Sequence, residues 1–553
     1  MRQCLVFISG AEKDCNVPAM NREISGIYYK GVGKMKRKVE LGLSFVWLLL
    51  CYAVICTYIA KCGTAFIDSD MSSEMVLSKL ISQEGGVLSK SWYYSTELRV
   101  LNIQLVLAPL FHVFDSWQTV RTVGSAILLA LLAATYIFMA RGLNISLNTA
   151  LLSAGVLMLP LSGSYTYSVL TGLFYIPHVC ISFVLFGLFC RYSKYSSQKK
   201  SCVLLAVTAA ISLIAGLGGV RQLFVFMAPA AAAAVLGLLC KIKEEDAAAG
   251  RKILRVALIS LAAAFIGLAV NKLIFPGIYS FCDYGNNTYG RTVLFESFSF
   301  ESLEFCISSI LELCGFKTGA IFSGYLIYNL LCAAVFLAAA LSIRQLLKDR
   351  EFDYAEKYTA IYLLCGLALL AAAFCFTDMD KITRYFVPVL AFALPCICMC
   401  LEKIKLDGKI KKSCTAVLLA LFALCSLNTY RQMFPADTNT ELKNVVSYLE
   451  QEGFTEGYSS FWNGNIITEL SDGKIEMRIV STDLITERDD MQYVYKWLQN
   501  KSHTETVPDS RFFLILSAAE DENCGLDQSP IYRSDIYTIY AFDSYEDFSA
   551  LWA

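Results

Sequence analysis

Charged residues are scarce in this chain of 553 residues, at 17%, whereas 56% of the residues are hydrophobic. Together with a mean hydropathy of +0.51, this excludes an ordinary soluble globular protein. The surplus of positive charge expected of a nucleic-acid-binding protein is also missing, because the formal net charge is −1. What the chain has instead is a series of apolar runs long enough to cross a bilayer. It is therefore predicted to be a multi-pass membrane protein with no nucleic-acid partner.

The 21 cysteines do not indicate a disulfide framework. Most of them lie inside apolar runs, where a free thiol behaves as a small hydrophobic side chain. Cys396, Cys398 and Cys400 lie close together, but their run has no histidine or acidic neighbours that would complete a metal site. We therefore expect neither disulfides nor a metal in the spans.

About eleven apolar runs of roughly 20 residues each are predicted to be membrane spans. They lie at 41–60, 117–140, 145–161, 171–190, 202–218, 222–240, 254–275, 322–343, 359–376, 386–401 and 414–434. Lysines and arginines gather in alternate loops, which the positive-inside rule assigns to the cytoplasm. This parity places the segment 1–40 inside, and it places the first loop, 61–116, and the tail from 435 outside. Met35 precedes Lys36, Arg37 and Lys38, so we expect the natural chain to start at Met35.

The tail, 435–553, is predicted to be an extracytoplasmic α/β domain beyond the membrane part, 41–434. Leu442, Val445, Val446 and Leu449 share one helical face. The segments 474–479, 511–516 and 536–540 have the alternating or continuous apolar pattern of strands. No nucleotide-binding loop or catalytic triad is evident, so we expect the domain to pack on the membrane part or to help recognise an acceptor.

An acidic cluster, Asp68, Asp70 and Glu74, follows the first span directly. Placing carboxylates so close to a bilayer costs free energy, so such residues usually have a function. The cluster therefore indicates chemistry at the membrane surface. Asp70 is the preferred general base because it can share a helical face with Glu74. Asp68 lies nearer the span and is expected to orient a partner or to cap the helix, although the choice between the two aspartates stays open.

Three arginines from distant parts of the chain, Arg121, Arg221 and Arg384, are predicted to lie at the same membrane level as this cluster. Arginine binds phosphate oxygens with two parallel donors, so these residues are candidates for a donor phosphate. Acceptor or lipid contacts are expected from Glu74, Tyr93, Tyr94, Glu97 and Tyr385. The stretch 98–114 is predicted to be a helix lying at the interface.

These features resemble the GT-C superfamily of membrane glycosyltransferases, which includes protein O-mannosyltransferases and the bacterial aminoarabinose transferase of lipid A. The resemblance is carried by the acidic cluster and by the blocks 108–111, 120–121, 219–221, 383–388 and 457–463. It implies a mainly α bundle and an inverting transfer from a polyprenyl-phosphate sugar to a lipid, glycan or protein acceptor. Ser69 separates the two aspartates that are adjacent in many relatives.

Metal-dependent relatives carry a second acidic motif in the second outer loop, whereas the loop 162–167 of this chain has no carboxylate. No divalent metal or other cofactor is therefore expected. Two alternatives stay open: a transporter or flippase of lipid-linked glycans, and a non-catalytic membrane scaffold. A transporter should carry charges along a path through the membrane and often has internal repeats.

Overall fold

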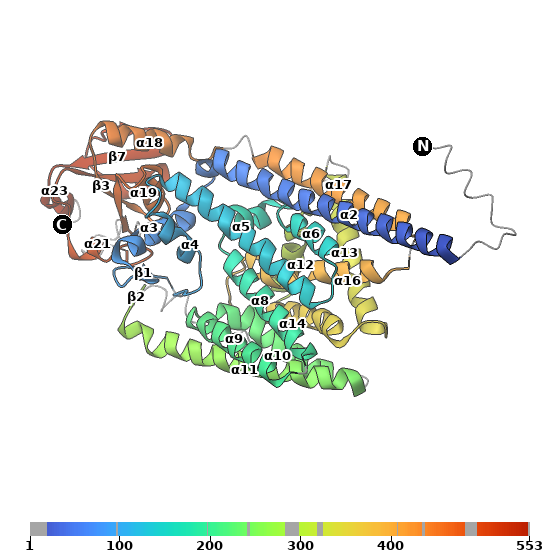
Figure 1. The fold of residues 1–553 in the computed structure, drawn as a ribbon. Coiled ribbons are helices and arrows are strands. Elements are labelled where there is room, and N and C mark those ends of the chain that lie inside the picture. The colour runs from blue at the N-terminus through green and yellow to red at the C-terminus, as the bar shows by residue number, and fades with distance from the viewer. Residues whose placement is uncertain are drawn as a thin grey trace, which may run out of the picture.

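The apolar runs predicted as spans form the helices of an elongated bundle (Figure 1). The computed structural model describes residues 19–95, 98–195, 197–239, 244–282, 298–317, 325–405, 407–433, 437–481 and 495–550. The bundle helices are α2 (Ala19–Cys62), α5 (Trp117–Gly142), α6 (Leu147–Leu157), α8 (Ile176–Lys194), α9 (Gln198–Leu217), α10 (Ala228–Leu239), α11 (Glu244–Leu273), α13 (Leu326–Lys348), α14 (Tyr354–Phe376), α16 (Ala393–Lys403) and α17 (Gly408–Met433).

Within the described residues, 9 helices are long and apolar enough to cross a membrane. Two shorter apolar stretches, Leu147–Leu157 and Leu223–Leu239, correspond to the other two predicted runs. The first is short because Pro160 lacks an N–H group and restricts the residue before it, which ends the helix early. The second begins as the π-helix η3 (Leu223–Met227) and continues as α10. The predicted multi-span helical bundle is confirmed.

The basic loops that were predicted to share one side of the membrane lie together at one end of the bundle. Lys194 donates to the carbonyl oxygen of Gly142 at 2.7 Å, and Asn144 donates to Asp353 at 3.1 Å. Lys403 forms an ion pair with Glu356 at 2.6 Å. Contacts between loops so far apart in the sequence show that these basic loops gather at the same end of the bundle.

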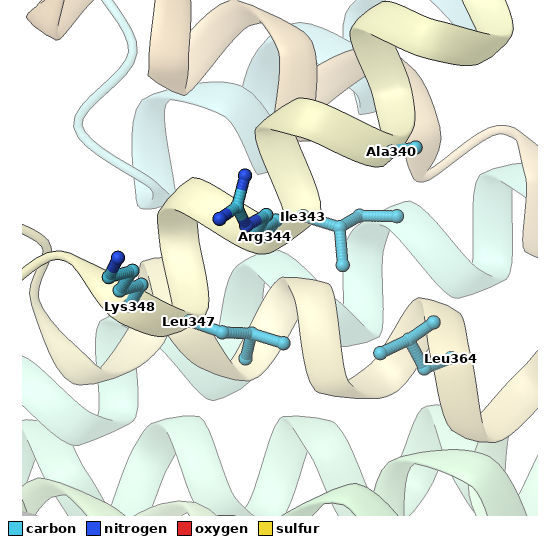
Figure 2. A pocket seen from close by; sticks show the side chains of 6 residues that line it. All are labelled: Ala340, Ile343, Arg344, Leu347, Lys348 and Leu364. Carbon is cyan, nitrogen blue, oxygen red and sulfur yellow. The ribbon is translucent and has the colours of Figure 1, made fainter.

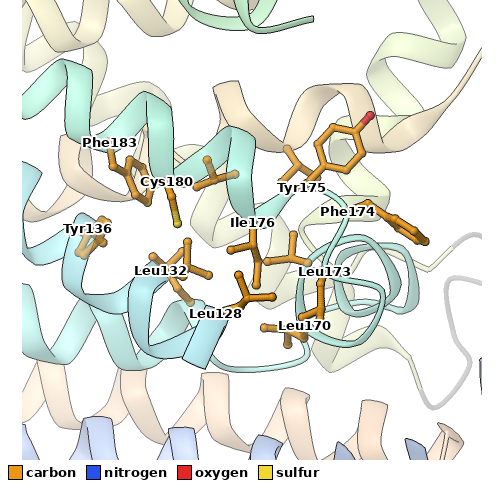
Figure 3. Close-up of a cluster of buried hydrophobic side chains, with 14 of the residues drawn as sticks. Leu128, Leu132, Tyr136, Leu170, Leu173, Phe174, Tyr175, Ile176, Cys180 and Phe183 are labelled. Carbon is orange, nitrogen blue, oxygen red and sulfur yellow. The ribbon is translucent and has the colours of Figure 1, made fainter. Parts of the chain in front are cut away.

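The interior of the bundle is a continuous apolar core. Figure 3 shows part of it, where Leu128, Leu132 and Tyr136 of α5 face Cys180 and Phe183 of α8. The same cluster continues into the segment before α8, which contains Phe174 and Tyr175 (Figure 3). Aromatic rings pack at centroid distances of about 5 Å, as in the pair of Tyr136 and Phe183 at 5.4 Å. This core supports the residues at the opposite end of the bundle from the basic loops.

The first outer loop carries short elements at that opposite end. They are the 3₁₀-helix η1 (Gly63–Ala65), α3 (Ser69–Glu84), the strand β1 (Tyr93–Tyr94) and α4 (Gln104–Leu110). The interfacial helix predicted over 98–114 is helical only over the 7 residues of α4. Later segments reach the same end: α7 (Gly163–Tyr165), the π-helix η2 (Thr166–Thr171), the 3₁₀-helix η4 (Phe275–Gly277), β2 (Ser280–Phe281), α12 (Phe300–Leu313), the 3₁₀-helix η6 (Thr383–Phe386) and α15 (Val387–Leu390).

The tail forms a small α/β domain beside the first outer loop (Figure 1). Its sheet has five strands in the order β4-β3-β5-β7-β6, with β3 parallel to β4 and β5, and β7 antiparallel to β5 and β6. Its elements are α18 (Thr440–Gln451), β3 (Glu456–Ser460), α19 (Gly464–Leu470), β4 (Glu476–Val480), α21 (Ser502–Glu505), β5 (Phe512–Ser517), α22 (Ala518–Cys524), β6 (Tyr532–Arg533), β7 (Tyr537–Phe542) and α23 (Tyr545–Ala550). The predicted helix and all three predicted strands are present, whereas β3 and β6 were not predicted.

Specific hydrogen bonds fix this domain on the first outer loop and on α5. Asn439 donates to the carbonyl oxygens of Thr64 and Ile67 at 3.1 and 2.9 Å. The backbone N–H of Trp117 at the start of α5 donates to Asp472 at 2.8 Å. Gly473, with a φ of 77°, lies so close to the Trp117 ring that a Cβ atom there would be 2.9 Å from it. The predicted packing of the tail on the membrane part is therefore observed.

Candidate functional site

The acidic cluster lies at the N-terminus of α3, where its two aspartates have different surroundings. Asp68 is the N-cap, because its Oδ1 accepts from the backbone N–H of Met71 at 2.9 Å. Its Oδ2 accepts from the hydroxyl of Tyr167 at 2.6 Å. Both oxygens of Asp68 therefore hold structure together, as the predicted capping role requires.

Asp70 and Glu74 lie one helical turn apart on α3 and both line the same cavity, which confirms the predicted shared face. The cavity has a volume of about 610 Å³ and lies between the first outer loop, the end of the bundle and the tail domain. Polar and aromatic side chains from all three parts line it: Asp70, Ser73, Glu74, Trp92, Tyr94, Arg99, Asn102, Gln104, Phe174, Tyr175, Arg221, Asp380, Arg384, Tyr385, Phe461, Trp462, Tyr495 and Trp497.

Arg384 is a charged neighbour of Asp70. Its Nη1 lies 3.9 Å from Oδ2 of Asp70, which is beyond hydrogen-bonding distance. The two side chains are 27% and 35% exposed, so neither charge is sealed inside the protein. Arg384 is held at this place by η6, which follows the segment after α14. Because the pair is open toward the cavity, a ligand could enter between the two groups.

The electrostatic surroundings favour proton acceptance by the α3 carboxylates. Burial raises the pKa of Asp70, and the neighbouring charge of Asp68 raises that pKa further, while Arg384 and Arg99 oppose the rise. Burial also raises the pKa of Glu74, whose Oε2 accepts from Asn102 at 3.1 Å. A carboxylate with a raised pKa is a stronger base once it is ionised. Asp70 therefore combines access to the cavity with a raised pKa.

Arg221 reaches the cavity from the turn between α9 and η3. Gly219 in this turn has a φ of 99°, a conformation that favours glycine. The π-helix η3 begins two residues after Arg221. The guanidinium lies 5.7 Å from the ring centre of Tyr175 and 5.5 Å from that of Tyr385. Two aromatic faces so placed attract the cation and orient its donors.

Arg384 has a similar aromatic neighbour, because its guanidinium lies 5.7 Å from the ring centre of Phe174. Phe174 and Tyr175 belong to the apolar core (Figure 3). The packing of the bundle therefore fixes the rings that the two arginines contact. Arg221 and Arg384 are thus brought together in one cavity, as the sequence predicted.

Arg121 does not join them, which corrects the predicted set of three arginines. Its Nε and Nη2 donate to the two carboxylate oxygens of Glu469, both at 2.6 Å. A further bond runs from Nη2 to the carbonyl oxygen of Met71 at 3.1 Å. The two side chains are only 7% and 5% exposed. Arg121 is therefore occupied by a carboxylate of the tail domain and connects α5 to α19.

Only some of the residues predicted to contact the acceptor line the cavity. Tyr94 lines the cavity, but its hydroxyl is bonded to the backbone of Ser89. Tyr93 is not among the lining residues, and its hydroxyl pairs with Thr504 of the tail domain at 2.9 Å. Tyr385 lines the cavity beside Arg221. Glu97 lies outside the described residues.

Several lining residues were not predicted from the sequence. Arg99, Asn102 and Asp380 come from segments treated as an apolar helix or as a plain loop. Arg99 could have been found from the sequence, because it is a charged residue inside the mostly apolar stretch 98–114. Trp462 and Trp497 belong to the tail, where no local pattern relates them to the carboxylates of α3. Among the described residues, no group of three or more metal-ligating side chains comes together.

A second hollow, of about 580 Å³, lies between α13 and α14 (Figure 2). Its lining is apolar except for Arg344 and Lys348 on α13, and it contains no carboxylate. A reaction that needs a base has no candidate there, so the cavity at α3 is the better site.

No protein-family model matches the sequence, and no curated protein matches it. The structure is similar to that of ArnT from Cupriavidus metallidurans bound to undecaprenyl phosphate, with a TM-score of 0.57, 12% identity, and coverage of 90% of this chain and 97% of that one. The apo state of ArnT matches with a TM-score of 0.57 and 11% identity, over 91% of this chain and 98% of ArnT.

An oligosaccharyltransferase of Archaeoglobus fulgidus in the apo form has a TM-score of 0.49 and 12% identity, and the match covers 86% of this chain and 69% of that one. The likeness to the aminoarabinose transferase ArnT extends over nearly the whole of both chains. The chain therefore has the fold of the GT-C membrane glycosyltransferases, as its sequence predicted.

Proposed function

We propose that this protein is an integral membrane glycosyltransferase that moves a sugar from a polyprenyl-phosphate donor to an acceptor hydroxyl, with inversion. The observation that carries the proposal is one cavity containing both a base and two arginines, formed by Asp70, Arg221 and Arg384. The GT-C fold supports it, and ArnT of the same fold has been solved bound to undecaprenyl phosphate.

In the proposed step, the acceptor oxygen attacks C1 of the donor sugar and forms a new C1–O bond. The bond between C1 and the phosphate oxygen breaks, and its electron pair leaves with the polyprenyl phosphate. The proton of the acceptor hydroxyl moves to the carboxylate of Asp70. Arg221 and Arg384 bind the phosphate oxygens and stabilise the charge that develops on the leaving group. Attack opposite the leaving group gives inversion.

The place of the cavity supports an enzyme over a transporter of lipid-linked glycans. A transporter usually holds its substrate near the middle of the spans. This cavity is instead formed by the first outer loop, helix ends and the tail domain. Its location suits a reaction at the membrane surface, where the lipid-linked phosphate of the donor lies.

We propose further that the cavity and the tail domain face away from the cytoplasm in a cell membrane. The basic loops at the other end of the bundle support this orientation. Reporter fusions after Lys243 and Lys409 should report the cytoplasm, and a fusion after Ala436 should report the outside. A cytoplasmic signal from the last fusion would contradict the orientation.

The function can be tested with purified protein in lipid nanodiscs and a panel of polyprenyl-phosphate sugars. We expect release of polyprenyl phosphate together with glycosylation of an acceptor from an envelope extract. The same assay with excess chelator tests the expectation that no divalent metal is required, and transfer should then continue at the same rate. A wild-type protein that binds undecaprenyl phosphate but transfers none of the sugars would count against the enzyme.

A further inference from the structure

The tail domain contributes an aromatic surface to the cavity, which we call the aromatic wall and define as Phe461, Trp462, Tyr495 and Trp497. Phe461 and Trp462 directly follow β3, and Tyr495 and Trp497 lie in the segment before α21. Val480 and Ser481, at the end of β4, line the cavity next to them. The domain therefore turns the carboxyl ends of its parallel strands β3 and β4 toward the cavity. Open α/β sheets commonly bind ligands at this edge.

The rings of the aromatic wall contact one another and form a connected surface. The Tyr495 and Trp497 rings are stacked, with centroids 6.0 Å apart and an angle of 13° between their planes. Phe461 meets Trp462 at 5.3 Å and Trp497 at 6.5 Å, in both cases edge to face. Trp462 is nevertheless 71% exposed, although large aromatic side chains are normally well buried. An exposed tryptophan in a cavity otherwise rich in charge indicates an apolar ligand face.

The aromatic wall is fixed relative to the proposed base. The hydroxyl of Ser69, between the two aspartates, donates to the carbonyl oxygen of Trp462 at 2.7 Å. Asn465 of α19 donates to Ser73 of α3 at 2.8 Å. The backbone N–H of Leu498 donates to the carbonyl oxygen of Tyr93 at 2.9 Å. These bonds fix the position of the aromatic wall relative to the N-terminal turn of α3, which carries Asp70. A ligand on the wall therefore lies at a fixed position relative to Asp70.

We infer that the aromatic wall is the acceptor subsite and that the acceptor it takes is a carbohydrate. A sugar ring has C–H groups on its faces and hydroxyls at its rim, which suits aromatic rings beside carboxylates. The assignment to the acceptor rests on the proposed function, in which the acceptor must reach Asp70 while the donor phosphate lies at Arg221 and Arg384. Arg221 contacts the rings of Tyr175 and Tyr385, and Arg384 contacts that of Phe174, all of which belong to the bundle.

The test uses the full chain in nanodiscs with two kinds of probe. Soluble glucose, mannose and N-acetylglucosamine oligomers probe the wall, and undecaprenyl phosphate probes the arginines. Binding of both is measured by calorimetry for the wild type, W462A and W497A. W462F keeps a ring at the same place, and I536A removes another exposed apolar side chain of the same domain that does not line the cavity. Thermal unfolding shows that each variant is folded.

We expect the wild type to bind at least one oligomer, and W462A and W497A to bind it about tenfold more weakly. W462F and I536A should keep that affinity within about twofold, and all variants should bind undecaprenyl phosphate as the wild type does. No binding of any oligomer by the wild type, or equal binding by W462A and W497A, would overturn the inference. A parallel loss of undecaprenyl phosphate affinity would also overturn it, because the wall would then hold the donor.

The two proposals can fail separately in this design. Oligomer binding that depends on Trp462, without sugar transfer in any donor and acceptor combination, refutes the glycosyltransferase but leaves the carbohydrate site in place. Sugar transfer whose acceptor KM is the same in W462A and W497A as in the wild type supports the enzyme and refutes the acceptor subsite.

Discussion

The contact between α5 and α19 and the cavity at α3 each contain an arginine facing a carboxylate, but the protein satisfies the two pairs differently. Arg121 and Glu469 form two bonds of 2.6 Å and are almost fully buried. Arg384 and Asp70 are 3.9 Å apart and open to a cavity of about 610 Å³. Arg121 uses Nε and Nη2 to bind Glu469 and Met71, whereas Arg384 lies beyond hydrogen-bonding distance of Asp70. The comparison separates a structural arginine from a candidate phosphate-binding one.

The largest effect is expected from removing the proposed base. Asp70→Asn keeps the size of the side chain but cannot accept the proton, so the rate of sugar transfer should fall by about 10²- to 10⁴-fold. Undecaprenyl phosphate binding and expression should be unchanged. The transfer assay described above measures the rate, with Asp68→Asn as the matched variant. We expect a smaller loss for Asp68→Asn, because an amide oxygen can still cap α3 and only the bond from the Tyr167 hydroxyl is weakened.

Wild-type activity of Asp70→Asn together with an inactive Asp68→Asn would reverse the assignment of the base. Full activity of both variants would exclude the mechanism.

Breaking the buried pair should damage stability. Glu469→Ala leaves the charge of Arg121 buried without its carboxylate, and such a loss costs about 3–5 kcal/mol. The free energy of unfolding in detergent measures it. Glu301→Gln, which breaks the exposed pair with Lys381, is the control and should have no measurable effect.

The double variant Arg121→Met with Glu469→Leu removes both charges and should recover most of the lost stability. A Glu469→Ala protein as stable as the wild type would show that the pair is not a structural contact.

Replacing the cavity arginines by lysine should weaken donor binding. Arg221→Lys and Arg384→Lys keep the charge but lose the paired donors, so affinity for undecaprenyl phosphate should fall by about tenfold. Equilibrium binding in nanodiscs measures this, and the protein should still insert. Arg121→Lys is the matched variant, and its donor affinity should equal that of the wild type. Unchanged affinity in both cavity variants would mean that these arginines only lie at the membrane interface.

The smallest effect concerns pH and stability. The pKa of Asp70 is raised in the folded protein, first by burial and then by Asp68. Between its ordinary value near 3.9 and the raised value, the folded state keeps a proton that the unfolded state has lost. The free energy of unfolding therefore falls as pH rises through this window.

The Asp70→Asn side chain does not ionise, so the variant does not lose this free energy of unfolding as the pH rises. At neutral pH the variant should therefore be more stable than the wild type, by less than about 1 kcal/mol. The difference should vanish below the ordinary carboxyl pKa. Unfolding curves of both proteins at several pH values measure it, and a less stable Asp70→Asn at neutral pH would contradict the direction of the pKa shift. For the same reason, the transfer rate should decline on the acidic side at a pH above that of an ordinary aspartate.

Much of the fold followed from local patterns. The apolar runs gave the helices, and the alternating residues of 474–479 and 536–540 gave β4 and β7. The acidic cluster was also found this way, since Asp70 and Glu74 are one turn apart in any helix that contains both. Helix lengths were less certain, because Pro160 ends α6 within an apolar run.

The sequence by itself determined the membrane class, the alternation of basic loops and the candidate carboxylates, because hydropathy, charge and helical period are local properties. Only the tertiary structure decided that Arg221 and Arg384 share the cavity while Arg121 binds Glu469, 348 residues further along the chain. It also decided that Trp462 and Trp497 face α3. Contacts across such separations depend on how the tail domain packs against the bundle, and that packing is set by the shape and bonding of the whole chain.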